Sequence, residues 1–250
     1  MIPKIIHYCW LSKDPIPKDM QMFIDGWYEK LPDYEFMLWD FNRFDIHSSQ
    51  WVKEAFSKKK YAFAADYIRL YALYNYGGIY MDMDVEVLKS FDPFLKLKTM
   101  ICFENSKQGL EMATFGVEKG AAWVKECLKY YENRPFIKAD GKLDTVTLPF
   151  IIKQFCLKDS YLLEHAQKDM GSTLAVLSSD FYSPKTTFRD EKIVLTSNTV
   201  SIHHFKGTWL PWYSKIEKRV SNALGFESKD FIRAAIYKIQ LEIAKRKIKK

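Results

Sequence analysis

The order of hydrophobic and polar positions near the start of the chain predicts alternating strands and helices. Pro3–Trp10 is rich in β-branched and aromatic residues and predicts a strand. Leu11–Lys18 carries two prolines and predicts a loop, Asp19–Lys30 a helix, and Tyr34–Trp39 a second short strand. A strand, a loop, a helix and a strand in this order favour an α/β sheet.

The strongest helical pattern spans Tyr61–Tyr76, where apolar residues recur at helical spacing. Gly77-Gly78 ends this helix, because glycine commonly follows the last helical turn in a left-handed conformation. Ile79–Val87 reads I-Y-M-D-M-D-V-E-V and predicts one alternating strand. Further elements are expected later in the chain: strands over Ile101–Glu104 and Ser201–Phe205, and helices over Ala121–Tyr131 and Thr147–Phe155.

The composition suits one α/β domain with an appendage. The chain has 250 residues, of which 48% are apolar, so a sizeable core is available. Its net charge is +7, and residues 229–250 alone carry eight Lys or Arg against two acidic residues. Because the rest of the chain is close to neutral, we expect no nucleic acid partner. We therefore predict a domain over residues 1–215 and a C-terminal basic helical segment over residues 216–250.

The basic tail also carries a hydrophobic pattern of its own. Ile232, Ile236, Ile239 and Ile243 recur at helical spacing among Lys and Arg, which predicts a basic amphipathic helix. Two interpretations stay open: peripheral contact with an anionic membrane surface, or packing on the domain with a solvated basic end. The membrane interpretation suits an enzyme whose acceptor is a lipid-linked saccharide.

Cysteine usage and hydrophobic runs bear on the compartment. The cysteines are Cys9, Cys102, Cys127 and Cys156, with no C-x-x-C pair and no zinc-type spacing, which predicts reduced thiols. The first residues have no apolar signal-peptide core, and no uncharged stretch is long enough to span a bilayer. We expect a cytoplasmic location, at the inner face of the plasma membrane if the tail binds lipid.

Four groups in the helix and strand around Gly77-Gly78 are predicted to meet. Asp66 and Arg69 are three residues apart and share a helix face. From Asp66 the helix rises about 15 Å to its end. After the glycine turn, a strand to Asp84 runs back about 17 Å. Asp82 and Asp84 therefore return to the level of Asp66 and Arg69.

Such a cluster can hold a metal ion. Two carboxylates one residue apart on a strand point to the same side and can share one Mn²⁺ or Mg²⁺, with a diphosphate supplying other ligands. A bare D-x-D is also common at a solvated strand end. The spacing of Asp66, Arg69 and the two glycines favours the metal interpretation.

The run A-x-x-A-D-x-x-R-x-x-x-L-x-x-x-G-G-x-Y-x-D-x-D over residues 62–84 resembles the DXD region of glycosyltransferase family 32. That family includes yeast-type initiating mannosyltransferases, bacterial capsule and lipopolysaccharide sugar transferases and, more distantly, clostridial glucosylating toxins. The resemblance implies a GT-A fold, a Rossmann-like mixed sheet flanked by helices. It also implies retaining, metal-dependent transfer of a hexose from a nucleotide sugar to a saccharide acceptor in capsular or surface polysaccharide synthesis. UDP is favoured as the nucleotide by analogy with bacterial relatives.

The resemblance also implies residue roles in this motif. Asp66 and Arg69 would contact the ribose and sugar hydroxyls of the donor, and Tyr80 belongs to the same donor-binding motif. Asp82 would touch the sugar or ribose, and Asp84 would bind the metal. Asp82, Asp84 and Arg69 are therefore the candidate catalytic residues. No enzyme nucleophile stands out, so front-face attack by the acceptor is the default hypothesis.

Two further segments resemble the family. The opening I-P-K-I-I-H-Y-C-W would place Trp10 against the base, although Trp10 could also be a core aromatic residue. The late segment H-H-F-K-G-T-W, residues 203–209, makes His204 the candidate third metal ligand, with a structural histidine as the alternative. Lys206 or Gly207 would meet the diphosphate, and Trp209 would close over the donor.

Two other function classes remain alternatives. I-Y-M-D-M-D-V also resembles the nucleophile motif of haloacid-dehalogenase-type phosphatases, in which Asp82 would be phosphorylated, but the later acidic pair of that family is missing. A non-catalytic protein that binds nucleotide sugars or glycans is the second alternative. Turnover separates the three: donor hydrolysis with Mn²⁺, phosphate release from a sugar phosphate, or binding alone.

Overall fold

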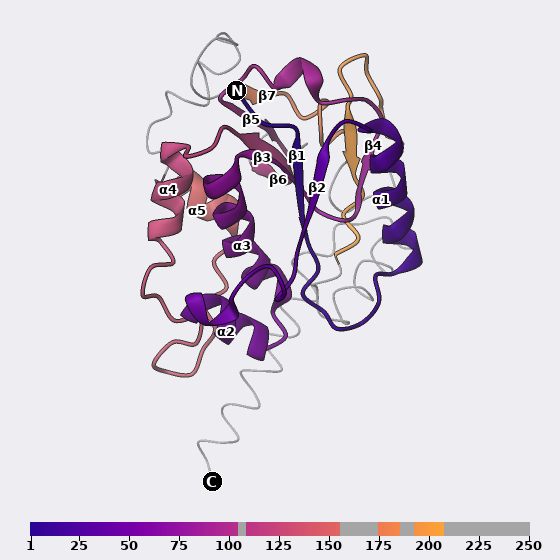
Figure 1. The fold of residues 1–250 in the computed structure, drawn as a ribbon. Coiled ribbons are helices and arrows are strands. Elements are labelled where there is room, and N and C mark those ends of the chain that lie inside the picture. Colours follow the sequence, from indigo (N-terminus) through magenta and orange to yellow (C-terminus); the bar gives the residue numbers. More distant parts are fainter. Residues whose placement is uncertain (105–108, 156–174, 186–192, 208–250) are drawn as a thin grey trace, which may run out of the picture. The chain divides into compact units, whose positions relative to one another are not determined.

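A mixed sheet runs through the described part of the chain, which in this computed structural model comprises residues 1–104, 109–155, 175–185 and 193–207 (Figure 1). Six strands lie in the order β2-β1-β3-β6-β5-β7. The strand β1 is parallel to β2 and β3, β6 is antiparallel to β3 and β5, and β7 is parallel to β5. Their bounds are β1 Ile5–Cys9, β2 Glu35–Trp39, β3 Gly78–Met81, β5 Thr99–Phe103, β6 Leu110–Val117 and β7 Ala175–Leu177.

The helices and a second, small sheet complete the described elements. The helices are α1 Lys18–Lys30, α2 Gln50–Ser57, α3 Tyr61–Tyr76, α4 Ala122–Lys129 and α5 Leu148–Phe155, with short 3-10 helices at Ile46–Ser48 and Asp92–Phe94. The small sheet pairs β4 Val85–Val87 with β8 Ser201–His203 in antiparallel fashion. The predicted α/β class is confirmed, as are most predicted elements, whereas α2, β6 and β7 were not predicted.

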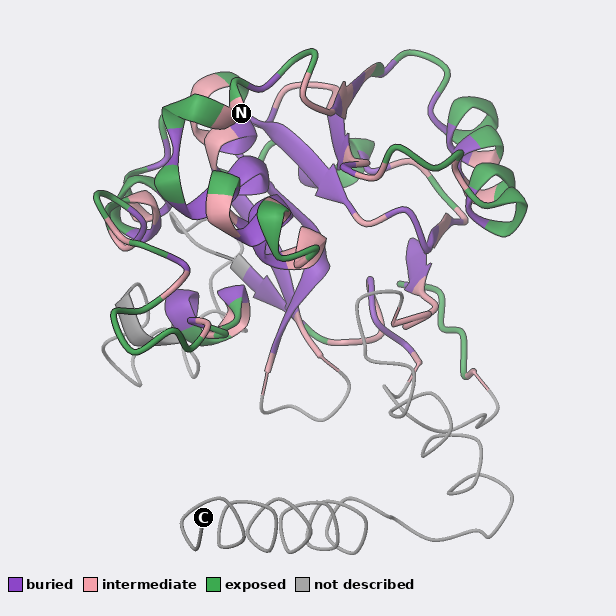
Figure 2. Cartoon of the chain, turned by 90° about the horizontal axis from the view of Figure 1, so that it is seen from below, coloured by how far each residue is buried: buried purple, intermediate pink, exposed green. Residues whose placement is uncertain are grey.

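Side chains of the central strands alternate between two hydrophobic clusters, one on each face of the main sheet. The first cluster contains Tyr80 and the buried hydrophobic residues of α2, α3, α4 and α5. The second contains Ile79 and Met81 and is covered by α1 and by the small sheet. Figure 2 shows the central strands buried along their length, while exposed residues gather on the outer sides of the helices and loops.

The predicted strand Ile79–Val87 is broken in the structure. The strand β3 ends at Met81, and the chain turns at Asp82, where the Val85 N–H donates to the Asp82 carbonyl at 3.1 Å. The chain then leaves the main sheet and continues as β4 in the small sheet. The hydrophobic pattern cannot reveal this break, because Met81, Met83 and Val85 all enter the same cluster before and after the turn.

The turn between α3 and β3 requires glycine at both positions. Gly77 has φ 69° and Gly78 has φ 105°, in the region that side chains disfavour. A Cβ on Gly77 would lie 2.6 Å from the Lys119 nitrogen, and a Cβ on Gly78 would lie 2.6 Å from the Ile5 carbonyl oxygen. The chain therefore returns from α3 directly against the edge of β1.

A buried histidine, His7, forms a hydrogen bond to this turn. The Trp39 Nε1–H donates to Nδ1 of His7 at 3.0 Å, so the ring proton of neutral His7 is on Nε2, which donates to the Gly77 carbonyl at 2.7 Å. Burial lowers the pKa of His7 to about 4. His7 is thus a neutral link between β1, β2 and the glycine turn.

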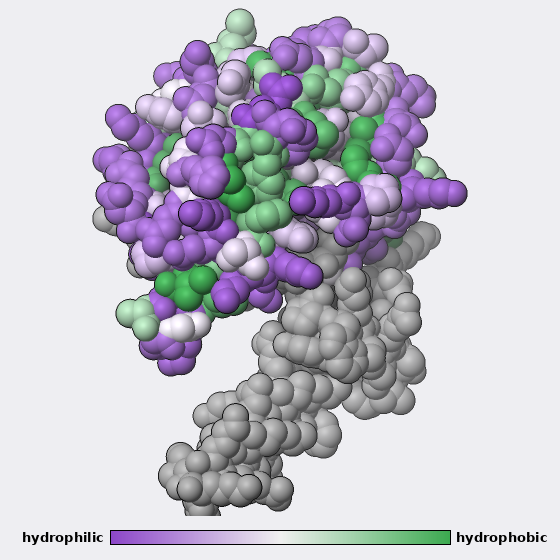
Figure 3. Space-filling model, turned by 60° about the horizontal axis from the view of Figure 1, so that its bottom comes forward, coloured by the Kyte–Doolittle hydropathy of each residue, from purple (hydrophilic) through white to green (hydrophobic). Residues whose placement is uncertain are grey.

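Three of the four cysteines lie within the described residues. Cys9, Cys102 and Cys127 are free thiols. Hydrophobic residues reach the surface in patches between hydrophilic ones (Figure 3). Among the described residues, no helix is both long and apolar enough to cross a membrane. The basic tail, Trp209, Cys156 and the expected boundary at residue 215 lie outside the described residues.

We predict that Gly78→Ala destabilises the protein more than Gly120→Ala. Both glycines have positive φ, but a Cβ on Gly120 meets no atom within 4 Å. Gly120→Ala should cost about 1–2 kcal/mol for the backbone conformation alone. Gly78→Ala should cost about 1–3 kcal/mol more, because the chain must also move away from β1. Urea unfolding of the two variants measures the difference, and equal costs would contradict the close approach.

We predict that His7 makes the fold acid-labile. Its pKa is lower in the folded than in the unfolded state, so as pH falls below 6.5 the unfolded chain takes up a proton first and stability decreases. Between pH 7 and pH 5 this group should lower the free energy of unfolding by about 2 kcal/mol. His7→Gln keeps a donor for Gly77 and an acceptor for Trp39 but does not titrate, so its stability should fall by that much less over the same range.

Candidate metal centre

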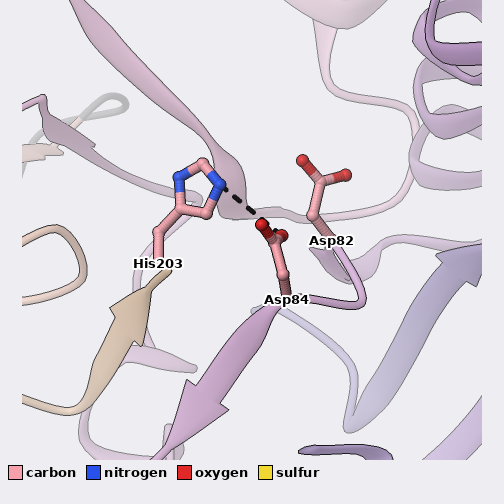
Figure 4. Close-up of side chains that lie close together, drawn as sticks. All are labelled: Asp82, Asp84 and His203. Carbon is pink, nitrogen blue, oxygen red and sulfur yellow. Dashed lines mark ion pairs between the residues drawn. The ribbon is translucent and has the colours of Figure 1, made fainter. Parts of the chain in front are cut away.

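Three side chains from two distant parts of the sequence converge beside the small sheet. Asp82, Asp84 and His203 each offer one ligand atom, and these atoms lie within 4.8 Å of one another (Figure 4). The antiparallel pairing of β4 with β8 sets Val85 opposite His203. Because Asp84 directly precedes Val85, this pairing brings its carboxylate beside the imidazole.

The segment after β8 encloses Asp84. Its Oδ2 accepts a hydrogen bond from the Lys206 backbone N–H at 2.8 Å, and its Oδ1 lies 3.5 Å from Nε2 of His203. Its carbonyl oxygen accepts the backbone N–H of His204 at 3.0 Å. Asp84 is therefore a buried, oriented carboxylate and not a solvated strand end.

Arg69 balances the charge of two carboxylates. Its Nη2 lies 3.4 Å from Oδ1 of both Asp66 and Asp82, and Nη1 donates to the Met112 carbonyl at 2.9 Å. The guanidinium also lies over the Tyr80 ring, 4.4 Å from its centroid, and the Tyr80 hydroxyl donates to Oδ1 of Asp82 at 3.0 Å. The predicted meeting of Asp66, Arg69 and Asp82 across the glycine turn is present in the structure.

The neighbouring carboxyl group of Asp66 has an altered acidity. Burial raises the pKa of Asp66 to about 6, and the opposing charge of Arg69 limits the shift. The helix α3 thus presents a weakly acidic carboxyl and a permanent cation at one site.

An irregularity in β6 supports the positions of Arg69 and Asp82. Met100 of β5 pairs with Gly116 of β6, but Cys102 pairs with Glu111, so β6 has extra residues between these two pairs. Within that stretch the Met112 carbonyl accepts a hydrogen bond from Arg69, and the Ala113 carbonyl accepts one from the Asp82 backbone N–H at 2.8 Å. Backbone groups of β6 therefore hold both the arginine and the turn.

Glu111 is a residue at this site that the sequence analysis missed. It is only 3% exposed, its Oε1 accepts the Ala113 N–H at 2.7 Å, and its Oε2 lies 3.1 Å from Nδ1 of His203. Burial alone would lower the pKa of His203, but Glu111 and Asp84 raise it to about 9. The available signal was one acidic residue inside the apolar run L-E-M-A-T-F-G-V, since a buried acid needs a partner.

The structure places His203, and not His204, beside the two aspartates. His204 directs Nε2 to Oε2 of Glu86 at 2.8 Å and stacks on Phe23 with 4.8 Å between ring centroids. His203 is the last residue of β8 and His204 follows it; the two rings have different partners, and only that of His203 faces the carboxylates. The expectation that His204 supplies the third ligand atom is corrected accordingly.

The other residues expected to contact the donor are Trp10, Lys206, Gly207 and Trp209, of which the structure describes the first three. Trp10 follows β1, whose carboxyl end lies at the same sheet edge as that of the parallel β3, and its Nε1 donates to the Asp14 carbonyl at 2.7 Å. The ammonium group of Lys206 pairs with Asp19 of α1, so only its backbone N–H contacts Asp84. Gly207 has φ 58°, and Trp209 lies outside the described residues.

The three ligand atoms fit a divalent cation. Two carboxylate oxygens suit Mg²⁺ and Mn²⁺, and an imidazole nitrogen favours Mn²⁺ over Mg²⁺. The hydrogen bond from the second ring nitrogen of His203 to a buried carboxylate is a frequent companion of metal-binding histidines.

Residues 17–101 match the family described as glycosyltransferase sugar-binding region containing DXD motif. An inositol phosphoceramide mannosyltransferase of Schizosaccharomyces pombe is 30% identical over 132 residues, covering 51% of this chain and 36% of that protein. A mannosyl phosphorylinositol ceramide synthase of Saccharomyces cerevisiae is 28% identical over 165 residues, covering 62% of this chain and 43% of that protein. The chain thus spans less than half the length of these two curated relatives.

Among solved structures, the PaToxG glycosyltransferase is similar to this chain with 20% sequence identity, covering 68% of this chain and 75% of that one. The TM-score is 0.48, which is too low to establish a common fold.

We predict that Arg69→Met destabilises the protein by about 3–5 kcal/mol, because the buried Asp66 and the half-buried Asp82 would be left beside each other without their cation. Arg43→Met is the matched control, since Arg43 also donates to a carbonyl, that of Leu38, but is exposed. Denaturant unfolding measures both. Adding Asp66→Asn to Arg69→Met should restore part of the loss, and no restoration would contradict charge balance as its cause.

Proposed function

With the resemblance to glycosyltransferase family 32 confirmed over residues 17–101, we propose that this chain is a retaining, divalent-metal-dependent glycosyltransferase. It transfers a hexose from a nucleotide sugar to a saccharide acceptor in capsular or surface polysaccharide synthesis. A UDP-sugar is the favoured donor. The observation that carries this proposal is the convergence of Asp82, Asp84 and His203 beside the buried Arg69. The curated relatives are named as mannosyl-transferring enzymes, which supports a hexose.

Asp82, Asp84 and His203 would hold the metal ion. A bound divalent ion supplies Lewis-acid stabilisation of the charge that develops on a departing nucleoside diphosphate. The protein contributes orientation: Tyr80 and Arg69 hold Oδ1 of Asp82, and the Lys206 N–H holds Oδ2 of Asp84. These bonds fix the carboxylates before the donor arrives, so little reorganisation is needed during the reaction.

The donor would lie along the carboxyl ends of β1 and β3. Trp10 follows one of these parallel strands and Asp82 the other, so an aromatic ring and the metal ligands share one edge of the sheet. In α/β sheets, ligands commonly bind at the carboxyl ends of strands. The Asp66 carboxyl and the Arg69 guanidinium lie beside Asp82 and are the groups proposed to contact sugar and ribose hydroxyls.

We propose front-face attack by the acceptor hydroxyl, with no covalent enzyme intermediate. A lipid-linked acceptor at the cytoplasmic membrane surface accords with the relatives' names, which describe transfer to ceramide lipids. In this scheme the basic segment of residues 229–250 provides the peripheral membrane contact.

The phosphatase alternative agrees less well with the geometry. In that mechanism Asp82 must be free to attack phosphorus, and a lysine must lie close by. Here Oδ1 of Asp82 is held by Tyr80 and Arg69, and the ammonium group of Lys206 is paired with Asp19. A histidine beside the two carboxylates favours a metal-diphosphate site instead.

We predict slow, Mn²⁺-dependent hydrolysis of one donor in a panel that includes UDP-glucose, UDP-galactose and GDP-mannose. Asp84→Asn and His203→Ala should lower this rate about 100-fold or more, because a ligand to the metal is lost. His204→Ala is the matched control from the adjacent position and should retain the rate, since His204 faces Glu86. Liberated nucleoside diphosphate is the quantity measured.

Two outcomes would contradict this proposal. Phosphate release from sugar phosphates without donor hydrolysis would support the phosphatase. Equal loss in the two histidine variants would contradict the assignment of His203 over His204.

A further inference from the structure

Glu111 is a buried acid that the proposed reaction does not itself use. It lies on β6 immediately before the stretch of extra residues and is 3% exposed. Both of its oxygens are engaged: Oε1 by the Ala113 N–H and Oε2 by Nδ1 of His203. Burying a carboxylate is unfavourable unless the carboxylate is paired, so the partners of Glu111 should explain its position. Its Oε2 contacts His203, which lies on a strand of the other sheet.

The chemistry of imidazole defines what this contact does. Neutral imidazole has one N–H and one nitrogen lone pair, and a carboxylate can only accept a hydrogen bond. With Oε2 of Glu111 at 3.1 Å from Nδ1, the ring proton of His203 belongs on Nδ1. In the neutral form of His203, which is the form that binds a metal ion, the lone pair is then on Nε2, the nitrogen that faces Oδ1 of Asp84 at 3.5 Å.

Rigid backbone contacts hold both partners. The Ala113 N–H fixes Glu111 at 2.7 Å, and the β4–β8 pairing fixes His203. The ring of His203 also lies against Phe205, with 3.8 Å between centroids. The imidazole is therefore oriented before any ion binds.

A second histidine–glutamate pair in the same small sheet offers a comparison. His204 lies 2.8 Å from Glu86, but the side chain of Glu86 is 41% exposed, and His204 is not among the converging ligand groups. Proximity of Glu to His is thus common to both pairs, while burial and a facing carboxylate belong only to the pair of Glu111 and His203.

We propose that Glu111 is a positioning residue of the metal centre: it keeps the proton of His203 on Nδ1 and orients the ring so that Nε2 binds the divalent ion together with Asp82 and Asp84. This inference rests on the proposed function, because it presupposes that the three groups hold a metal ion. Glu111 acts through His203 and contacts neither metal nor donor.

The test measures Mn²⁺ affinity directly, from the loss of the electron paramagnetic resonance signal of free Mn²⁺, with and without UDP. Glu111→Leu removes the acceptor at similar volume and should weaken binding about 10- to 100-fold. Glu111→Gln keeps one acceptor oxygen and should give a smaller loss. Glu86→Gln is the matched control and should leave the affinity unchanged. Electron-nuclear double resonance should detect a coordinated imidazole nitrogen in the unaltered protein and a weaker one in Glu111→Leu.

A double-mutant cycle separates positioning from general damage. In a His203→Asn background, Glu111→Gln should cause no further loss of Mn²⁺ affinity, because Glu111 would have no imidazole to orient. The same loss in both backgrounds, or unchanged affinity in both Glu111 variants, would overturn the role of Glu111. If the unaltered protein binds no Mn²⁺ with or without UDP, the metal centre and the proposed function fail together.

Discussion

The antiparallel pairing of β4 with β8 is the constraint on which the candidate metal centre depends. β3 ends at Met81, and the chain turns through Asp82 and Asp84 into a second sheet. Only there does it meet the strand that carries His203. The turn between sheets exposes Asp82 enough to bind a ligand, while the facing strand and the Lys206 N–H enclose Asp84.

Charge balance is the second requirement, and Arg69 meets it. Three acidic groups lie on this side of the sheet, and burying them without a cation would be unfavourable. Arg69 reaches Asp66 and Asp82 together while its other nitrogen is anchored on the Met112 carbonyl. The irregular stretch of β6 thus links the helix, the turn and Glu111 into one connected site.

Local patterns predicted much of this. The helix Tyr61–Tyr76 was predicted with the bounds that the structure has, since its apolar spacing and its terminal glycines are local signals. The meeting of Arg69 with Asp82 followed from helix rise, strand rise and the glycine turn between them. The buried strand β6 was missed, because a fully buried strand lacks the alternation of apolar and polar residues that marks a half-exposed one.

Residue spacing alone predicts which elements form around the glycine turn and which acidic groups return to Arg69, because these depend on short-range geometry. The break of the strand at Asp82 is evident only in the folded chain, since Met81, Met83 and Val85 enter one cluster on either side of it. The tertiary structure also decides between His203 and His204 and brings in Glu111. Those choices depend on strand pairing between segments far apart in the chain, and no local pattern of residues records which side of a distant strand a side chain will face.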